Sequence, residues 1–295
     1  MNIQWYPGHM TRAKRQMQED IKLIDLVIEL LDARIPLASR NPDIDELCKG
    51  KARLVLLNKS DLADDAVTDR WADYFASSGI LACKINCRNN SDMKQINAAV
   101  LKACEAKIER DRKRGIRNRP VRAMVVGIPN VGKSTFINSF ARKGVTKTGN
   151  KPGVTRGKQW IRMSNTLELL DTPGILWPRF EDPQVGVRLA LIGSIKDDIL
   201  NTEELALELI RQLQDLYPGE LEHFYGIEIP TDRPDAAVSD NEGSKIQEQD
   251  PVREAALLEQ IAVARGCIGK GGTPDYMRTA GMLLEKEHGI FFKTI

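Results

Sequence analysis

Residues 122–135 read RAMVVGIPNVGKST, with a glycine-rich turn between an apolar run and a helical pattern. The run before Gly127 predicts a buried strand, the residues from Ser134 onward predict a helix, and the turn between them has the spacing GxxxxGK(S/T). Such a turn lets backbone N–H groups converge on phosphate, and the helix N-terminus adds partial positive charge. We expect Lys133 to reach the β- and γ-phosphates of a nucleotide and the Ser134 hydroxyl to bind Mg²⁺. The motif alone does not distinguish ATP from GTP, or a kinase from a hydrolase.

Apolar runs alternate with helical patterns on both sides of this loop, through the first ~180 residues. Strand-like runs lie at 26–31, 53–57, 80–85, 122–126, 160–163 and 167–170, and helical patterns at 11–24, 66–77, 92–114 and 133–141. The alternation predicts an α/β domain with a mainly parallel sheet that helices cover on both faces.

The pattern changes after Trp177-Pro178, where no further strand is predicted. Amphipathic helices are predicted at 202–216, 254–265 and 273–287, and the composition of residues 231–249 predicts a loop. We therefore expect an α/β domain over residues 1–178, followed by an all-helical domain over 179–295.

A second motif, Asn58-Lys59-Ser60-Asp61, follows the apolar run RLVLL. The Asp61 carboxylate can accept from both N1–H and the exocyclic amine of guanine, whereas adenine lacks that donor pair and would leave a buried carboxylate unpaired. Asn58 is expected to brace the loop and contact the base edge, and the Lys59 stem to cover the face of the base. NKSD is an ordinary turn sequence by itself, but together with a phosphate loop it predicts guanine nucleotide binding.

A third motif, Asp171-Thr172-Pro173-Gly174, follows the apolar run LELL. We expect Asp171 to hold Mg²⁺ through water and the Gly174 N–H to contact the γ-phosphate. Thr155, in the sequence PGVT, lies between the phosphate loop and this motif. That position favours closure over Mg²⁺ and the γ-phosphate, the alternative being an ordinary loop threonine.

The order of the motifs is rotated relative to ordinary GTPases, which have the phosphate loop first. Here NKSD and a short base loop at Asn86-Cys87, expected to contact the guanine O6, come before it. Because the parts need only meet in space, a site can survive this circular permutation, with the helix at 92–114 joining the original chain ends. The predicted nucleotide contacts are Asn58, Lys59, Ser60, Asp61, Asn86, Cys87, Asn130, Val131, Gly132, Lys133, Ser134, Thr135 and Gly174.

Composition is typical of a soluble globular protein: 295 residues, 42% hydrophobic, 28% charged, with a formal net charge of +2. Five cysteines without CxxC spacing indicate free thiols in a reducing compartment rather than disulfides or a zinc site. The first residues, MNIQWYPGHM, lack the pattern of a signal peptide, and no run approaches the roughly 20 apolar residues that span a bilayer. We expect a cytoplasmic protein without membrane association.

One charge run stands out at 107–122, KIERDRKRGIRNRPVR. The net charge of the chain does not indicate nucleic-acid binding, but a local concentration of charge can. The run is either the solvated face of a linking helix or a surface that faces RNA, and the sequence leaves both readings open.

Several motifs together carry a resemblance to a known family. They are WYPGHM at 5–10, DAR at 32–34, NKSD, GIPNVGKST, PGVT, DTPG, and RGCI at 265–268 followed by Gly271, Gly272 and Asp275. Over nearly its whole length the chain resembles the circularly permuted GTPases of ribosome assembly, the YlqF group. The resemblance implies a cytoplasmic GTPase that matures the precursor of the large (50S) ribosomal subunit and binds rRNA and ribosomal proteins with help from its helical C-terminal domain. We expect it to act as a monomer.

The catalytic group is the least determined part of the predicted site. Many GTPases place a glutamine after DxxG to orient the attacking water, but here Ile175 follows Gly174 and cannot do so, so slow turnover and stimulation by a partner are expected. In the family the histidine of PGHM is a proposed substitute, which here is His9; a helix-start or surface histidine is the alternative. The expected catalytic groups are thus His9, Lys133 and Thr155, and Mg²⁺ is expected on Ser134, Thr155 and Asp171.

In related GTPases an asparagine at the position of Asn130 helps to bind K⁺, which acts as a fixed positive charge beside the phosphates. The alternative for Asn130 is bracing of the loop. For the chain as a whole, two functions stay open: a GTPase switch that hydrolyses GTP to GDP and phosphate during late large-subunit assembly, and a GTP-gated rRNA-binding module in which hydrolysis is incidental. The NKSD and DTPG pair argues against a nucleoside or metabolite kinase, which needs neither.

Overall fold

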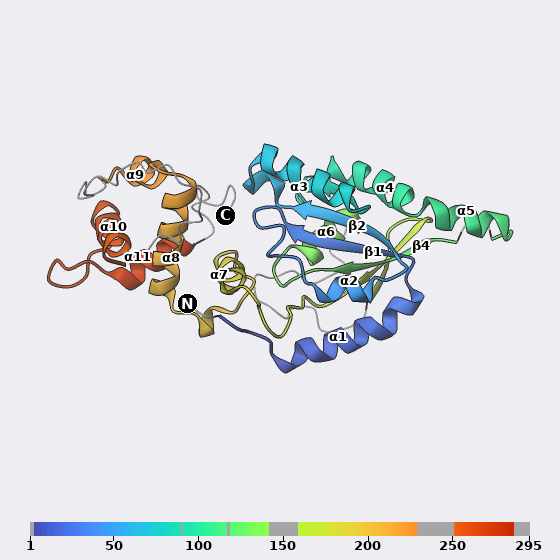
Figure 1. Cartoon of the computed structure of the whole chain (residues 1–295), viewed down its shortest axis with the longest axis horizontal. Helices are drawn as coiled ribbons and strands as arrows, with labels where there is room; N and C mark the ends of the chain where they lie inside the picture. The colour runs from blue at the N-terminus through green and yellow to red at the C-terminus, as the bar shows by residue number, and fades with distance from the viewer. Residues whose placement is uncertain (1–2, 90, 117–118, 142–158, 229–250, 286–295) are drawn as a thin grey trace, which may run out of the picture. The chain divides into compact units, whose positions relative to one another are not determined.

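The computed structural model describes residues 3–89, 91–116, 119–141, 159–228 and 251–285. Its centre is a six-stranded sheet in the order β3-β2-β1-β4-β6-β5, in which neighbours are parallel except for β5 with β6 (Figure 1). The strands are β1 (Leu26–Asp32), β2 (Ala52–Asn58), β3 (Leu81–Lys84), β4 (Val121–Val126), β5 (Gln159–Arg162) and β6 (Leu167–Asp171). The predicted α/β sheet is confirmed, with an antiparallel strand at one edge.

Helices cover both faces of the middle of the sheet. Every residue of β1 is buried, as expected for an apolar strand covered on both sides in a parallel sheet. On one face, Phe75 of α3 (Asp65–Ser77) packs on Leu31, Val55 and Leu57. In Figure 1, α1 lies below the sheet, α2 lies in front of its lower part and α6 lies behind it. The bounds are α1 (Gly8–Asp20), α2 (Asp43–Leu47) and α6 (Lys133–Ala141).

The connection from β3 to β4 contains two helices instead of the single helix predicted over 92–114. These are α4 (Asp92–Ala103) and α5 (Glu105–Lys113), separated by the buried Cys104 with φ −103° and ψ 8°. The first packs on β2 and β3, whereas α5, with much of the basic run, extends past the sheet (Figure 1). This connection joins β3, the neighbour of the strand that bears NKSD, to β4, which precedes the phosphate loop. The permuted order of the motifs requires such a link.

The described residues divide into two compact units between Asp198 and Ile199. The sequence predicts the boundary at residue 178, but α7 (Pro183–Leu191) and the residues that follow it belong to the unit with the sheet. Direct bonds tie this segment to the sheet unit: the buried Ser194 hydroxyl donates to the Pro129 carbonyl over 2.8 Å, and the Gly193 carbonyl accepts from the Asn130 side chain over 2.6 Å. The segment after 178 thus supports the phosphate loop.

The second unit is helical in its described residues, as predicted. It contains α8 (Thr202–Leu216), α9 (Glu220–Tyr225), α10 (Pro251–Ala264) and α11 (Tyr276–Leu284), and α8 packs against the other three. Asn201 caps α8, since its side chain accepts from the Glu204 N–H over 3.2 Å. Within this unit's described residues, an isolated bridge between Ile268 and Pro274 is the only β pairing. The loop predicted at 231–249 lies outside the described residues.

Candidate functional site

Four predicted segments meet at one edge of the sheet. The phosphate loop follows β4, Asn58 ends β2, Asp171 ends β6, and Asn86 follows β3. These strands are all parallel, so their carboxyl ends share an edge, which is where ligands bind in open α/β sheets. Thr155 lies outside the described residues, so its predicted place over Mg²⁺ stays a prediction.

Lys133 is folded back onto the phosphate loop. Its Nζ donates to the Gly127 carbonyl over 3.0 Å and to the Ile128 carbonyl over 2.8 Å. Burial lowers the pKa of Lys133 to about 8, and the Asp171 carboxylate partly opposes that shift. A buried ammonium among carbonyl dipoles favours an added negative charge, which a nucleotide phosphate would supply.

The DTPG motif lies directly on the phosphate loop. A Cβ on Gly174 would be 2.7 Å from both the N and the Cα of Pro129, and 2.8 Å from the Lys133 Nζ, so only glycine fits there. The buried Thr172 hydroxyl donates to the Val125 carbonyl over 2.6 Å. The two motifs are therefore in contact through backbone, without a layer of side chains between them.

The Asn58 side chain connects NKSD, to which it belongs, and the base loop at Asn86-Cys87 to the phosphate loop. Its side-chain amide donates to the Val131 carbonyl over 2.8 Å, and its side-chain oxygen accepts from the Cys87 N–H over 3.1 Å. Gly132, at φ +103°, makes room for it, because a Cβ there would be 2.5 Å from the Asn58 Nδ2. One buried side chain thus holds the base-reading edge, the base loop and the phosphate loop in register, and the bracing expected of Asn58 is present.

A buried ion-pair network orients Lys59. Its Nζ donates to the Asp32 carboxylate over 2.8 Å and to the Asn130 carbonyl over 3.1 Å. Arg34 binds the same carboxylate in a two-pronged manner, with both N–O distances at 2.8 Å. Burial acts to raise the pKa of Asp32, but Lys59 and Arg34 outweigh it and hold that pKa well below its usual range. These charge-assisted bonds hold the Lys59 side chain in one orientation between NKSD and the phosphate loop.

Beyond the buried Asn58, the NKSD motif presents an exposed carboxylate. Asp61 is exposed, and the Ser60 N–H is bonded to the Ile85 carbonyl over 3.2 Å, which ties NKSD to the start of the base loop. In that loop the Asn86 N–H donates to the Asp92 carboxylate over 2.8 Å. Burial raises the pKa of Cys87 to about 12, so its thiol stays protonated and serves packing rather than chemistry.

Two oxygen donors suit a magnesium ion at the phosphate edge. Asp171, at the end of β6, is 2% exposed, and Ser134 lies half-buried in the first turn of α6. Carboxylate and hydroxyl oxygens, completed by phosphate and water, form the ligand set that Mg²⁺ prefers. The residues present therefore fit the ion.

His9 is exposed in the first turn of α1, and the residue after it, Met10, contacts the segment that follows DTPG. The Sδ of Met10, its buried neighbour, accepts from the Leu176 N–H over 3.4 Å. Ile175 itself is buried, and its N–H points to the Gly127 carbonyl at 3.4 Å. The start of α1 thus lies next to the chain that leaves Gly174.

Asn130 has a bracing contact of its own. It adopts a left-handed backbone conformation with φ +57°, and its side-chain amide donates to the Gly193 carbonyl over 2.6 Å. The bracing alternative therefore has direct support, and the side-chain oxygen is the atom that a K⁺ ion would use.

Asp32 and Arg34 enter the sequence prediction only as part of the DAR motif of the family resemblance, without a stated role, and Ser194 has no predicted role. A signal for Asp32 existed: it is a carboxylate at the end of an apolar run, the same signal that identified Asn58 and Asp171. Ser194 had no such signal, because its partner in the phosphate loop is 65 residues away.

These elements define a P-loop GTPase domain with its motifs in permuted order. Residues 122–221 match the family model described as 50S ribosome-binding GTPase. Ribosome biogenesis GTPase A of Bacillus cereus is 47% identical over 290 residues, which cover 98% of this chain and 91% of that protein. The solved structure of GNP-bound YlqF from T. maritima superposes with a TM-score of 0.58 at 25% identity, covering 94% of each chain. The chain belongs to the ribosome biogenesis GTPase A family.

Fold and family together make the chain a guanine nucleotide-binding GTPase of ribosome biogenesis. The relative from Priestia megaterium, which has the same name, is 47% identical over 288 residues, covering 97% of this chain and 93% of that protein. Among the described residues, no helix has the length and apolar character needed to cross a membrane.

Proposed function

We propose that the chain is a GTP-driven switch in late assembly of the large (50S) ribosomal subunit. The main support is the pair of bonds from the Asn58 side chain to Val131 and Cys87, which places the NKSD motif directly beside the phosphate loop. The family model described as 50S ribosome-binding and the relatives named for ribosome biogenesis support the ribosomal role. The partners proposed are the subunit precursor, its rRNA and its ribosomal proteins, met in the cytoplasm by a monomer.

The proposed roles in the nucleotide site follow the geometry. Asp61 reads the guanine edge, the Lys59 stem covers the base, and the Asn86-Cys87 backbone faces O6. Lys133 turns from its own loop carbonyls to the β- and γ-phosphates, and the Gly174 N–H contacts the γ-phosphate. The remaining proposed contacts are Ser60 and residues 130–132, 134 and 135.

Ser134, Asp171 and Thr155 are the proposed holders of Mg²⁺. When bound, the ion neutralises charge on the β- and γ-phosphate oxygens. Asp171 ends β6 and Lys133 begins α6 after the phosphate loop, so the protein brings two opposite charges to the proposed phosphate position before hydrolysis. With Lys133 at the phosphates and Thr155 closing over them, these residues stabilise the charge that develops on the transferred phosphoryl group.

His9 is the proposed catalytic residue, moving to the γ-phosphate in the complex with the ribosomal particle. The position of Met10 against Leu176 supports this, since it holds the start of α1 beside DTPG. The His9→Ala protein should lose about 100-fold in particle-stimulated turnover, the usual worth of acid–base or water-positioning help, while its GDP affinity stays unchanged. Single-turnover hydrolysis with and without particles measures this, with His223→Ala as the control. Unchanged stimulated turnover in the His9→Ala protein would exclude the role.

Asn130 is proposed to contribute its side-chain oxygen to a K⁺ ion while its amide stays on Gly193. The fixed positive charge would stabilise the transition state, so turnover should be about 10-fold faster in KCl than in NaCl at equal ionic strength. Steady-state phosphate release in the two salts measures this. Equal rates would leave Asn130 with its bracing role alone.

The ribosomal role is tested by co-sedimentation with large-subunit particles. A switch predicts binding that is strong with a non-hydrolysable GTP analogue and at least about 10-fold weaker with GDP, because the γ-phosphate selects one conformation. Binding that is equal with both nucleotides, and unaffected by loss of turnover, would favour the alternative of a GTP-gated rRNA-binding module. That module would show steep salt dependence of RNA affinity.

A further inference from the structure

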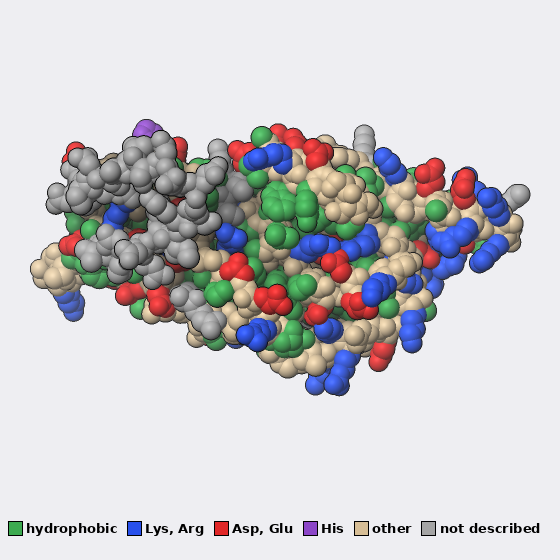
Figure 2. Space-filling view, in the orientation of Figure 1, with side chains coloured by type: hydrophobic (Ala, Val, Ile, Leu, Met, Phe, Trp, Pro, Cys, Tyr) green, Lys and Arg blue, Asp and Glu red, His purple; other side chains and the backbone are tan. Residues whose placement is uncertain are grey.

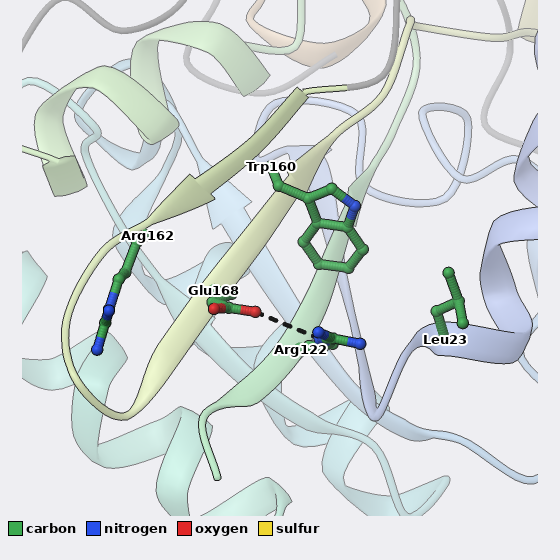
Figure 3. Close-up of a pocket in the computed structure, with 5 residues that line it drawn as sticks. All are labelled: Leu23, Arg122, Trp160, Arg162 and Glu168. Carbon is green, nitrogen blue, oxygen red and sulfur yellow. Dashed lines mark hydrogen bonds and ion pairs between the residues drawn. The ribbon is translucent and has the colours of Figure 1, made fainter.

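A pocket of about 440 Å³ opens on the sheet at the end of the strands opposite the nucleotide site. Its lining residues are Leu23, Arg122, Trp160, Arg162 and Glu168 (Figure 3). Arg122 and Glu168 are the second residues of β4 and β6, whereas the nucleotide motifs follow the last residues of those strands. The pocket is large enough for a small organic ligand or one base.

The strand register explains why these side chains share one face. Glu168 lies opposite Arg122 on one side and opposite Arg162 on the other, so a row of three charged residues crosses β4, β6 and β5. Trp160 is two residues before Arg162 and therefore points to the same face. Leu23, in the short 3₁₀ turn Ile21–Leu23 after α1, closes the side. This part of the sheet face has a polar, aromatic lining where a helix-covered face would be apolar.

The pocket has a net positive charge and an accessible aromatic ring. Arg122 Nε is 3.2 Å from the Glu168 carboxylate, whereas the Arg162 guanidinium donates to the Asn165 side-chain oxygen over 3.3 Å. The Arg122 guanidinium carbon is 5.4 Å from the centroid of the Trp160 ring, a cation–π distance. Trp160 is 36% exposed although it stands on a strand. An aromatic ring beside one guanidinium, with a second arginine in the same pocket lining, is a side-chain set that stacks bases and binds phosphates.

One carboxylate joins the pocket to the basic helix α5. Asp25 accepts from the Arg122 N–H over 3.1 Å and from Arg119 over 3.4 Å, and it pairs with Lys107 of α5 over 3.3 Å. Figure 2 shows Lys and Arg side chains gathered over α5 at that end of the domain. The exposed basic residues there are Arg110, Arg112, Lys113, Arg114 and Arg119. Asp25 thus connects Arg122 of the pocket to Lys107 of α5 and to Arg119, next to the exposed basic residues.

We propose that this pocket binds single-stranded RNA, with one unpaired base stacked on Trp160 and the flanking phosphates on Arg162 and α5. The inference rests on the proposed ribosomal function and assigns it a contact site. An acidic peptide would use the guanidiniums but not the ring. Duplex RNA keeps its bases stacked inside the helix, so it cannot fill a pocket of one-base size. The basic run whose meaning the sequence left open is the phosphate-binding extension of this site.

The test uses the full-length protein and fluorescence anisotropy with a labelled single-stranded oligouridine and a blunt RNA duplex of equal length. Trp160→Ala should weaken binding of the single strand by about 10- to 100-fold, the worth of one stacked base, and Trp160→Phe should keep most of the affinity. Arg162→Ala should reduce the magnitude of the slope of log affinity against log salt concentration by about 1, the value expected for the loss of one phosphate contact. Tyr74→Ala, which removes an exposed aromatic ring from α3, is the matched control and should leave affinity unchanged.

Two results would overturn the proposal: equal single-strand affinity for the wild-type and Trp160→Ala proteins, or displacement of the single strand by duplex RNA or polyglutamate at equal charge. GDP affinity and thermal unfolding of each variant confirm that the nucleotide site is intact. Co-sedimentation with large-subunit particles distinguishes failure of the RNA-binding proposal from failure of the proposed ribosomal role. If the wild type binds particles in a GTP-dependent manner and Trp160→Ala binds RNA equally well, the pocket assignment alone is wrong. If the wild type does not bind particles, the ribosomal role itself fails.

Discussion

The Gly174→Ala protein is expected to hydrolyse GTP about 100-fold more slowly than the wild type, because overpacking of this kind costs up to about 3 kcal/mol. The added Cβ would lie 2.7 Å from two backbone atoms of Pro129, which cannot rotate away, and 2.8 Å from the Lys133 Nζ. The DTPG segment must then move away from the phosphate loop. Both the Asp171 carboxylate and the backbone N–H of residue 174 are displaced by this movement. Single-turnover hydrolysis at saturating GTP measures the loss.

Gly281→Ala is the matched control for this substitution. Gly281 lies in α11, and a Cβ there meets nothing within 4 Å, so the helix gains propensity and hydrolysis stays at the wild-type rate. GDP affinity should fall less than turnover in the Gly174→Ala protein, since GDP lacks the γ-phosphate. Wild-type turnover in the Gly174→Ala protein would mean that the two motifs separate during catalysis.

The second large effect is expected from Asn58→Ala. The change leaves the Val131 carbonyl and the Cys87 N–H buried without their partner, and each such group costs about 1–3 kcal/mol. The base loop and the phosphate loop then lose their common support, so affinity for GDP and GTP should fall at least about 100-fold, equivalent to the loss of roughly 3 kcal/mol. Isothermal titration gives the affinity, and urea unfolding gives the loss of stability.

Asn89→Ala is the control for that loss. Its side chain makes an exposed local bond to the Ser91 N–H over 3.1 Å, so both the affinity and the free energy of unfolding should stay within experimental error. If Asn58→Ala unfolds at lower urea but binds GDP as tightly as the wild type, the bridge stabilises the fold without aligning the site.

The sheet and the position of the site could be predicted from the sequence because both depend on local patterns. A glycine-rich turn after an apolar run needs no distant information to be recognised, and the same is true of Asn58 or Asp171 at the end of a buried strand. The Asp32 network could not be predicted in the same way. It depends on the register that places Asp32 beside Asn58, and register is a property of the assembled sheet.

Two of the differences between the predicted and observed helices have different causes: α7 was not predicted, and the helix predicted over 92–114 is interrupted at Cys104. The start of α7 had a readable signal, since Asp182 caps it by accepting from the Gln184 N–H over 2.8 Å and Pro183 occupies its first turn. The break at Cys104 had none, because neither glycine nor proline marks it. The later domain boundary also had no local signal, since it depends on long-range contacts such as those of Ser194 with Pro129 and of Gly193 with Asn130.

The order of the strands has a consequence for how the protein becomes active during its own synthesis. Asn58 and Lys59 leave the translating ribosome well before Val131 and Asn130, which lie 73 and 71 residues further along and complete their bonds. Until β4 emerges, one edge of β1 has no neighbour and the guanine-reading half has no phosphate loop. We therefore expect a nascent chain to bind nucleotide only after the phosphate loop at 127–135 has been made.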